Sequence, residues 1–156
     1  MKVEIINPFL IATKKVLSEM LGIDAAMEKP YIRNDKYTDN HLLIMLGVVG
    51  QVEGQVGLSF DNTTALSVVS KMCMMEMTEM NDLALSALCE LGNMILGNSA
   101  TVLATSDVLI DITSPSLVQG NAIIKVPQAE SICIPFRLGD QHKMEIIVCL
   151  KDKKKD

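Results

Sequence analysis

The chain has 156 residues, of which 49% are hydrophobic and 21% charged, and this balance excludes a disordered polypeptide. A chain of this length buries roughly 68–70% of its unfolded surface, so we expect one domain over residues 1–150. The longest uncharged stretch, residues 91–106, contains Gly, Asn, Ser and Thr and is too short and too polar to cross a bilayer. Because no signal peptide is visible either, we expect a cytoplasmic protein without membrane insertion.

The net charge of −5 hides an asymmetry, because residues 151–156 carry four Lys and two Asp and leave the rest of the chain at −7. We expect this short segment to be a charged, flexible tail. An acidic body argues against nucleic acid as a partner, since phosphate binding requires clustered Lys and Arg. The chain also has no Trp, two Tyr and three Phe, and therefore little to stack on bases.

The four cysteines are far apart in the sequence, and no two of them form a Cys-x-x-Cys pair. A structural zinc site requires closely spaced ligands, and only His41 and His142 are available as histidines. We therefore expect reduced thiols and no metal site on this chain.

The first half reads as a helix followed by strands. Asn7-Pro8 predicts a helix start and Gly22 a helix stop, which gives a helix over residues 7–21. Residues 25–33 form a weak strand candidate because Pro30 interrupts it. Two further strands are predicted over residues 42–52 and 55–60, with a hairpin turn at Glu53-Gly54.

The second half begins with two helices. Asp61 is expected to cap a helix over about 62–75, and Asn81-Asp82 to open a longer one that ends near residue 105. Between them, residues 72–80 include five Met, which fits either core filling or an adaptable binding surface. Short strands follow, with turns at Gly120-Asn121 and Gly139-Asp140, over residues 108–112, 122–126, 131–137 and 144–151.

This order of elements predicts an α+β domain in which three helices pack on a largely antiparallel sheet. A displacement of 75 residues places Gly22 on Gly97 and Leu21 on Leu96, so that each helix precedes a group of strands. The domain is therefore interpreted as a pseudo-duplication of one helix-plus-strands unit.

The third helix carries a narrow polar stripe. At 100° per residue, Asp82, Ser86, Glu90, Asn93 and Gly97 fall within an arc of roughly 80°, opposite an apolar face. An amphipathic helix needs a solvated side, and that explanation stays open. Asn and Gly have poor helix propensity, however, which favours a selected function at these positions.

The stripe belongs to a longer pattern that resembles the CheC/CheX/FliY family of chemotaxis proteins. The matching segments are Ser86-x3-Glu90-x2-Asn93 with Pro115 after it, Ile6-Asn7-Pro8-Phe9, Glu90-Leu91-Gly92-Asn93 and Asp111-Ile112-Thr113. Within this family, CheX-like members carry one active helix and CheC-like members typically two. The 75-residue displacement matches Glu90 and Asn93 to Lys15 and Ser18, so the first helix is expected to lack the pair, as in CheX.

The resemblance implies a phosphatase that hydrolyses the aspartyl phosphate of the response regulator CheY. Asn93 would orient the attacking water, and Glu90 would ion-pair with the receiver's own Lys. Ser86, Asp82 and Gly97 would provide further docking contacts. No cofactor is expected on this chain, because Mg²⁺ belongs to the CheY substrate. The family also implies a homodimer joined through sheet edges.

One alternative keeps the same helix but no catalysis, as a module that binds a receiver domain or a flagellar-switch partner. An enzyme acting on small molecules is less well supported, since no nucleophile elbow, glycine-rich phosphate loop or H-E-x-x-H motif occurs. Measuring turnover on phosphorylated CheY distinguishes the phosphatase from the binder.

Overall fold

The computed structural model describes residues 3–34, 41–120 and 125–153. The three helices are α1 (Val3–Leu21), α2 (Asn62–Cys73) and α3 (Asp82–Ala104). The first four strands are β1 (Ala26–Met27), β2 (Tyr31–Ile32), β3 (His41–Gly50) and β4 (Val52–Asp61). The other four are β5 (Ile110–Ile112), β6 (Ser116–Gln119), β7 (Ile132–Leu138) and β8 (His142–Asp152). All the strand pairs described are antiparallel, which confirms the predicted α+β class.

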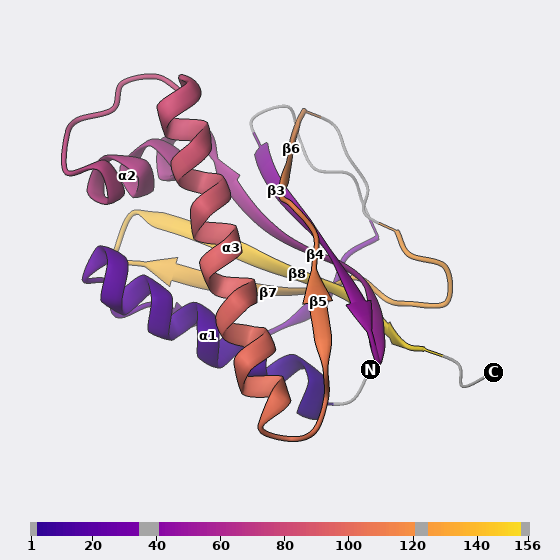
Figure 1. The fold of residues 1–156 in the computed structure, drawn as a ribbon. Helices are drawn as coiled ribbons and strands as arrows, with labels where there is room; N and C mark the ends of the chain where they lie inside the picture. Colours follow the sequence, from indigo (N-terminus) through magenta and orange to yellow (C-terminus); the bar gives the residue numbers. More distant parts are fainter. Residues whose placement is uncertain (1–2, 35–40, 121–124, 154–156) are drawn as a thin grey trace.

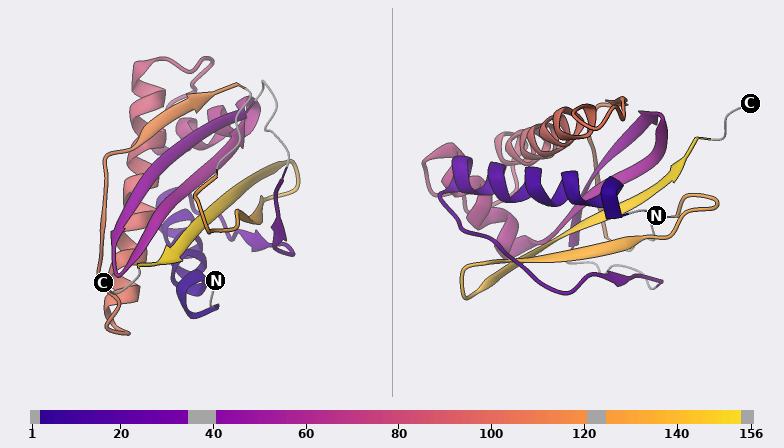
Figure 2. Two further views of the ribbon diagram at one scale, coloured as in Figure 1. Left: turned by 90° about the vertical axis from the view of Figure 1, so that its right-hand side faces the viewer. Right: turned by 90° about the horizontal axis from the view of Figure 1, so that it is seen from below.

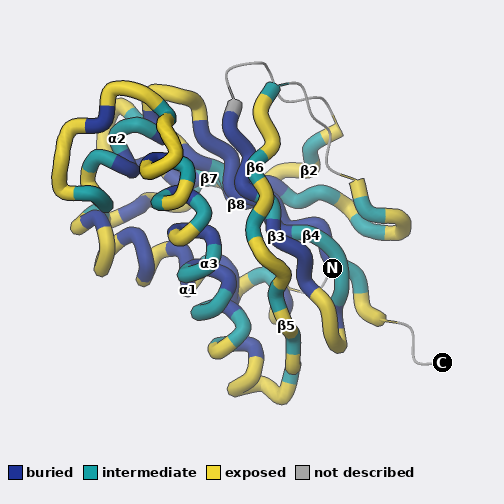
Figure 3. Tube along the Cα trace, turned by 45° about the horizontal axis from the view of Figure 1, so that its top comes forward, coloured by how far each residue is buried: buried dark blue, intermediate teal, exposed yellow. Residues whose placement is uncertain are grey.

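Helices α1 and α3 lie side by side on one face of the sheet (Figures 1 and 2). The main core lies between them and the sheet, and Figure 3 shows how the buried positions follow the long strands β3, β4 and β8. Alternate residues of a strand point to opposite faces, so Leu42 and Ile44 join this core while Leu43 joins a small second cluster with Cys133 and Ile147.

The order of strands shows that the domain consists of two equivalent units. The sheet runs β1-β7-β8-β4-β3-β5, with β2 paired to β7 and β6 paired to β3. Exchanging β1–β4 with β5–β8 reproduces the same order in reverse, including the two additional pairs. The predicted pseudo-duplication is therefore present in the topology. It relates α1 to α3 and leaves α2 without a counterpart.

The predicted displacement of 75 residues between the units is wrong. In α1 the Thr13 hydroxyl donates to the Phe9 carbonyl at 2.6 Å, and in α3 the Ser99 hydroxyl donates to the Ile95 carbonyl at 2.7 Å. Both hydroxyl residues are fully buried, and the two bonds are 86 residues apart. The glycine match misled because Gly22 follows α1, at a φ of 63°, whereas Gly97 lies inside α3.

Helix α1 starts earlier than the predicted residue 7, so Asn7-Pro8 lies within the helix and does not open it. Proline inside a helix removes one backbone hydrogen bond. Both Ile5 and Pro8 are buried, and their packing holds the first turn in helical form despite that loss. A capping signal in the sequence was overridden by tertiary contacts.

The hairpin between β3 and β4 turns at Gly50 and Gln51, and the prediction of a turn at Glu53-Gly54 is wrong. Gly54 lies inside β4, where a Cβ atom would come within 2.1 Å of the Cys149 carbonyl oxygen of β8. This glycine is therefore needed for the close approach of two strands.

The remaining elements follow the prediction with four differences. Strands β1 and β2 flank Pro30, whereas β6 was not predicted. The strand predicted over residues 122–126 falls largely outside the described residues, and Lys125 and Val126 belong to no strand. Strand β8 continues two residues into the predicted tail, where Lys151 forms an ion pair with Glu53 at 3.7 Å.

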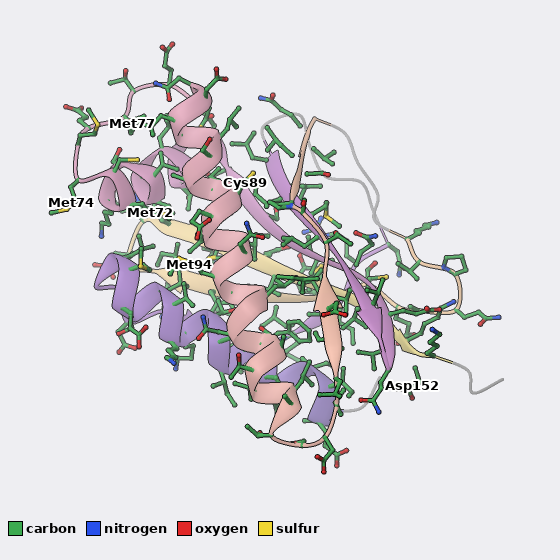
Figure 4. The ribbon with its side chains drawn as sticks, viewed as in Figure 1. Met72, Met74, Met77, Cys89, Met94 and Asp152 are labelled. Carbon is green, nitrogen blue, oxygen red and sulfur yellow. The ribbon has the colours of Figure 1, made fainter. Side chains whose placement is uncertain are left out.

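Some methionines of residues 72–80 fill the core and others are exposed, so each of the two interpretations holds for part of the segment. Met77 is buried, and Met72 and Met80 pack partly against the core, as expected for filler. Met74 and Met75 are exposed, and Met74 points away from the domain (Figure 4). None of the helices in the described residues has the length and apolar content that a membrane-spanning helix requires.

Candidate functional site

Helix α3 is fixed against the domain at its start and along its inner face. The Asn81 side chain accepts a hydrogen bond from the Ala84 N–H at 3.0 Å, which confirms the predicted cap. A Cβ on Gly92 would lie 3.1 Å from Leu46 Cδ1 and 3.2 Å from Ile44 Cγ2, so the helix backbone sits close to β3. The helix therefore presents its outer face from a rigid support.

The structure places all five residues of the predicted stripe on that outer face. Asp82, Ser86 and Glu90 are exposed, and Asn93 and Gly97 are half-buried. With a rise of about 1.5 Å per residue, the stripe is about 22 Å long, and Glu90 precedes Asn93 by about 4.5 Å along the axis. The helix thus brings the carboxylate and the amide onto one side, within reach of one partner.

The amide of Asn93 is available for an external contact. Another asparagine on the same helix, Asn98, donates from Nδ2 to the Met94 carbonyl at 2.7 Å and so has an internal role. The Asn93 side chain makes no such bond with the residues that the structure describes, and Glu90 forms no ion pair with them. Both polar groups lie on the outer side of α3, with their side-chain hydrogen-bonding capacity unused by the residues that the structure describes.

Gly97 leaves open space at the end of the stripe. No atom lies within 4 Å of the position that its Cβ would take, so packing inside the domain does not require glycine here. Glycine in a helix interior costs up to about 1 kcal/mol relative to alanine. Close approach of an external partner is a physical reason to keep it.

Strands β5 and β6 lie along the sheet edge beside α3 (Figure 1). Thr113, in the connection between them, is bonded to Gly47 of β3 in both directions: its hydroxyl accepts from the Gly47 N–H at 2.8 Å, and its own N–H donates to the Gly47 carbonyl at 3.0 Å. Pro115 is half-buried in the same connection. The segment next to the stripe is thereby held to the sheet.

Other chemistries on α3 find less support. Burial raises the pKa of the Cys89 thiol, which disfavours the thiolate needed for a nucleophile. Within the described ranges, no three His, Cys, Asp or Glu side chains gather where they could hold a metal ion. Two pockets of about 330 and 640 Å³ lie near Leu150 and near Arg33, and none of the stripe residues lines either pocket. The stripe runs along the outer side of a helix, a surface that suits a protein partner better than a small molecule, which prefers a concave pocket.

Comparison with known proteins identifies the family. A family model described as chemotaxis phosphatase CheX matches residues 42–137, a range that includes all of β3 but its first residue and the whole of β4 and α3. The chain belongs to the CheX family. This family match confirms the resemblance drawn from the sequence, and all five stripe residues lie within the matched range.

Relatives of known sequence and structure agree with the CheX assignment. The CheY-P phosphatase CheX of Thermotoga maritima is 36% identical over 121 residues, which are 77% of this chain and 78% of that protein. A CheC-like superfamily protein from Shewanella sp. PV-4 has a TM-score of 0.87 at 25% identity, covering 97% of this chain and 99% of its own. CheX of Borrelia burgdorferi, solved in complex with CheY, BeF3 and Mg²⁺, has a TM-score of 0.83 at 30% identity and covers 97% and 100%.

Proposed function

We propose that this chain is a phosphatase that hydrolyses the aspartyl phosphate of a CheY-type receiver domain. The observation that carries the proposal is the Glu90–Asn93 pair, which lies on the outer side of a well-supported helix and has no side-chain partner among the described residues. The CheX family and the Borrelia complex with CheY support the same partner.

The reaction needs a water molecule placed in line with the bond that breaks. The water oxygen attacks phosphorus, the bond between phosphorus and the aspartyl oxygen breaks, and the products are an aspartate carboxylate and inorganic phosphate, which takes up the water proton. Phosphoryl transfer responds mainly to positioning and electrostatics. A carboxamide suits this role, because its C=O accepts from the water while its N–H donates to a phosphoryl oxygen. We assign that role to Asn93, which acts by orientation rather than as a base.

Glu90 is proposed to set the docking register. Its exposed carboxylate lies one turn before Asn93 and is free to ion-pair with a lysine of the receiver. Ser86 and Asp82 continue the contact along the helix, and Gly97 allows the receiver backbone to come close. The Mg²⁺ ion of this reaction belongs to the phosphorylated receiver, so we expect no cofactor on this chain.

The test is phosphate release from phosphorylated CheY at sub-stoichiometric amounts of the protein. Asn93→Ala is expected to abolish turnover while binding of the receiver is largely kept, and Glu90→Ala to weaken both. Asn98→Ala is the matched control, because that amide bonds to its own helix. Full turnover in Asn93→Ala would contradict the mechanism, and retention of phospho-CheY without turnover would identify a binding module.

The homodimer expected from the family stays a prediction. Strands β1 and β5 end the sheet path, and an exposed edge strand permits pairing with a second copy. Light scattering of the purified protein would measure the mass directly.

A further inference from the structure

Two exposed apolar side chains lie at the start of the stripe, outside the residues assigned so far. Leu83, in the first turn of α3, is 54% exposed, and Met75, in the connection from α2 to α3, is 55% exposed. Leu83 precedes Glu90 by seven residues, so the two side chains share one side of the helix at about 10 Å along its axis. A receiver that pairs a lysine with Glu90 therefore passes close to Leu83.

The connection that carries Met75 is fixed to the end of α2. The Ser70 hydroxyl accepts from the Met77 N–H at 2.9 Å and donates to the Leu66 carbonyl at 2.6 Å, and the Met75 N–H donates to the Ser70 carbonyl at 3.2 Å. The Met77 side chain is buried, and the connection lies beside the start of α3 (Figure 4). Because these bonds hold the backbone, a partner that covers Met75 does not have to order a loop first.

Acidic side chains flank the apolar ones along the chain. Glu76, Glu79 and Asp82 are all exposed. Residues 72–124 contain six acidic residues and no Lys, Arg or His, whereas the rest of the chain has 13 acidic and 14 basic residues. The negative charge of the protein is thus concentrated in the region that includes α3. An apolar centre with a charged rim is typical of a protein interface, and a rim of one sign selects a partner of the opposite sign.

We propose that Leu83 and Met75 form the apolar centre of a contact that extends the receiver interface beyond the stripe and selects which receiver is accepted. The proposal rests on the function proposed for α3, because it deepens the same interface. The occupant is the receiver surface beside the phosphorylated aspartate, with an exposed apolar side chain among Lys or Arg. Covering Leu83 would also exclude water from the ion pair of Glu90 and so strengthen it. A second copy of this chain is disfavoured as occupant, since it would bring like charges together.

Replacing the apolar side chains by glutamine tests the centre of the contact. In calorimetric titration with CheY activated by BeF3 and Mg²⁺, Leu83→Gln/Met75→Gln is expected to weaken binding about tenfold. The heat-capacity change of binding should become less negative, because less apolar surface is buried. Phosphate release should show a raised KM with kcat nearly unchanged, since the contact lies away from the reacting atoms. Met27→Gln is the matched control, because Met27 is 48% exposed on β1.

Replacing the acidic side chains tests the rim. Glu76→Gln/Glu79→Gln is expected to slow association with activated CheY about threefold at low salt and to leave dissociation near that of the wild type, since rim charges act mainly on the encounter. Added salt should slow the wild type more than this variant. Asp24→Asn/Asp140→Asn removes two exposed charges elsewhere and is the control. Stopped-flow measurement gives both rates, and equal association rates for the two double variants would overturn the charge selection.

The remaining outcomes separate this proposal from the function proposed for α3. Unchanged affinity and heat-capacity change in Leu83→Gln/Met75→Gln, shown to be folded by urea titration, would overturn the contact. A lower mass of this variant in light scattering with unchanged receiver affinity would also overturn it and identify a second copy as the occupant. The catalytic assignment is judged by turnover in Asn93→Ala. Because that variant keeps the contact, adding Leu83→Gln to it should still weaken binding of activated CheY.

Discussion

The two glycines of α3 have different roles, which follow from what surrounds each of them. Gly92 faces the sheet, where a Cβ would press against Leu46 and Ile44. Gly97 faces outward, where a Cβ would meet no atom within 4 Å. The first glycine serves the packing of the domain, and the second serves the proposed approach of a partner.

Substitutions at these two glycines should therefore separate stability from docking. Gly97→Ala is expected to raise the free energy of unfolding by up to about 1 kcal/mol, because helix propensity improves without a clash. Gly92→Ala should gain less or lose stability, since the new methyl group strains against the core. Chemical denaturation of the two variants measures the difference, and equal gains would contradict the assigned packing.

A larger side chain at Gly97 tests the docking role. Gly97→Leu should keep the domain folded, yet weaken binding of activated CheY by tenfold or more because leucine occupies the space reserved for the partner. Calorimetric titration against CheY measures the affinity. Unchanged affinity would show that the receiver does not pass close to this position.

At the scale of elements, α2 and α3 begin where a side chain satisfies a backbone N–H group. Asp61 Oδ1 accepts from the Thr64 N–H at 2.7 Å and starts α2, as Asn81 starts α3. Helix α2 ends at Cys73 and is followed by the C-cap residue Met74, whose φ of 54° is left-handed. Since α2 connects the end of β4 to the segment before α3 and packs against both elements, its cap helps to fix the point at which α3 begins.

Removing the α2 cap should destabilise the domain without touching the proposed site. Asp61→Ala is expected to lower the free energy of unfolding by about 1 kcal/mol, because one helix N–H loses its acceptor. Asp61→Asn retains an acceptor and should recover most of the loss. Urea titration of the three proteins provides the measurement, and equal stability of Asp61→Ala and the wild type would refute the capping role.

At the scale of the whole molecule, the two units are tied together on the sheet face that the helices leave uncovered. The Tyr31 hydroxyl of β2 donates to Glu145 Oε1 of β8 at 2.6 Å, and Arg33 bonds to both residues. The Arg33–Glu145 ion pair is 3.2 Å long. This cluster fastens a short strand of the first unit to the hairpin of the second.

The cluster predicts a response to alkaline pH. Burial, followed by the hydrogen bond to Glu145, raises the pKa of the Tyr31 phenol above its usual value near 10. The folded state therefore holds this proton where the unfolded state has lost it, so stability is full below about pH 10 and falls as the pH rises further. Urea titrations from pH 9 to 11 should show a steeper fall in the wild type than in Tyr31→Phe. Parallel pH profiles would disprove the linkage.

The features that could be predicted from the sequence are those that depend only on residues close together along the chain. The caps Asp61 and Asn81 and the 3.6-residue period of α3 are local, and they predicted α2, α3 and the outward stripe. The start of α1 and the role of Gly54 depend on burial and on a neighbouring strand, which the local pattern does not contain. The relation between the two helices required their inward hydrogen bonds, because the glycines that looked equivalent occupy different structural positions.

The exchange symmetry of the sheet has a consequence for chain connectivity. Ile5 and Asp152 line one hollow, so the two ends of the domain are neighbours, and the exposed Thr78-Glu79 bond lies between the units. A circular permutant can begin at Glu79, join the original C-terminal end to residue 3 through a short glycine linker, and end at Thr78. In this permutant the second unit is synthesised before the first. It keeps every strand neighbour, so a cooperative melt and phosphatase activity near those of the parent are expected. A permutant that fails to melt cooperatively would show that folding of this sheet depends on the order in which its two units are synthesised.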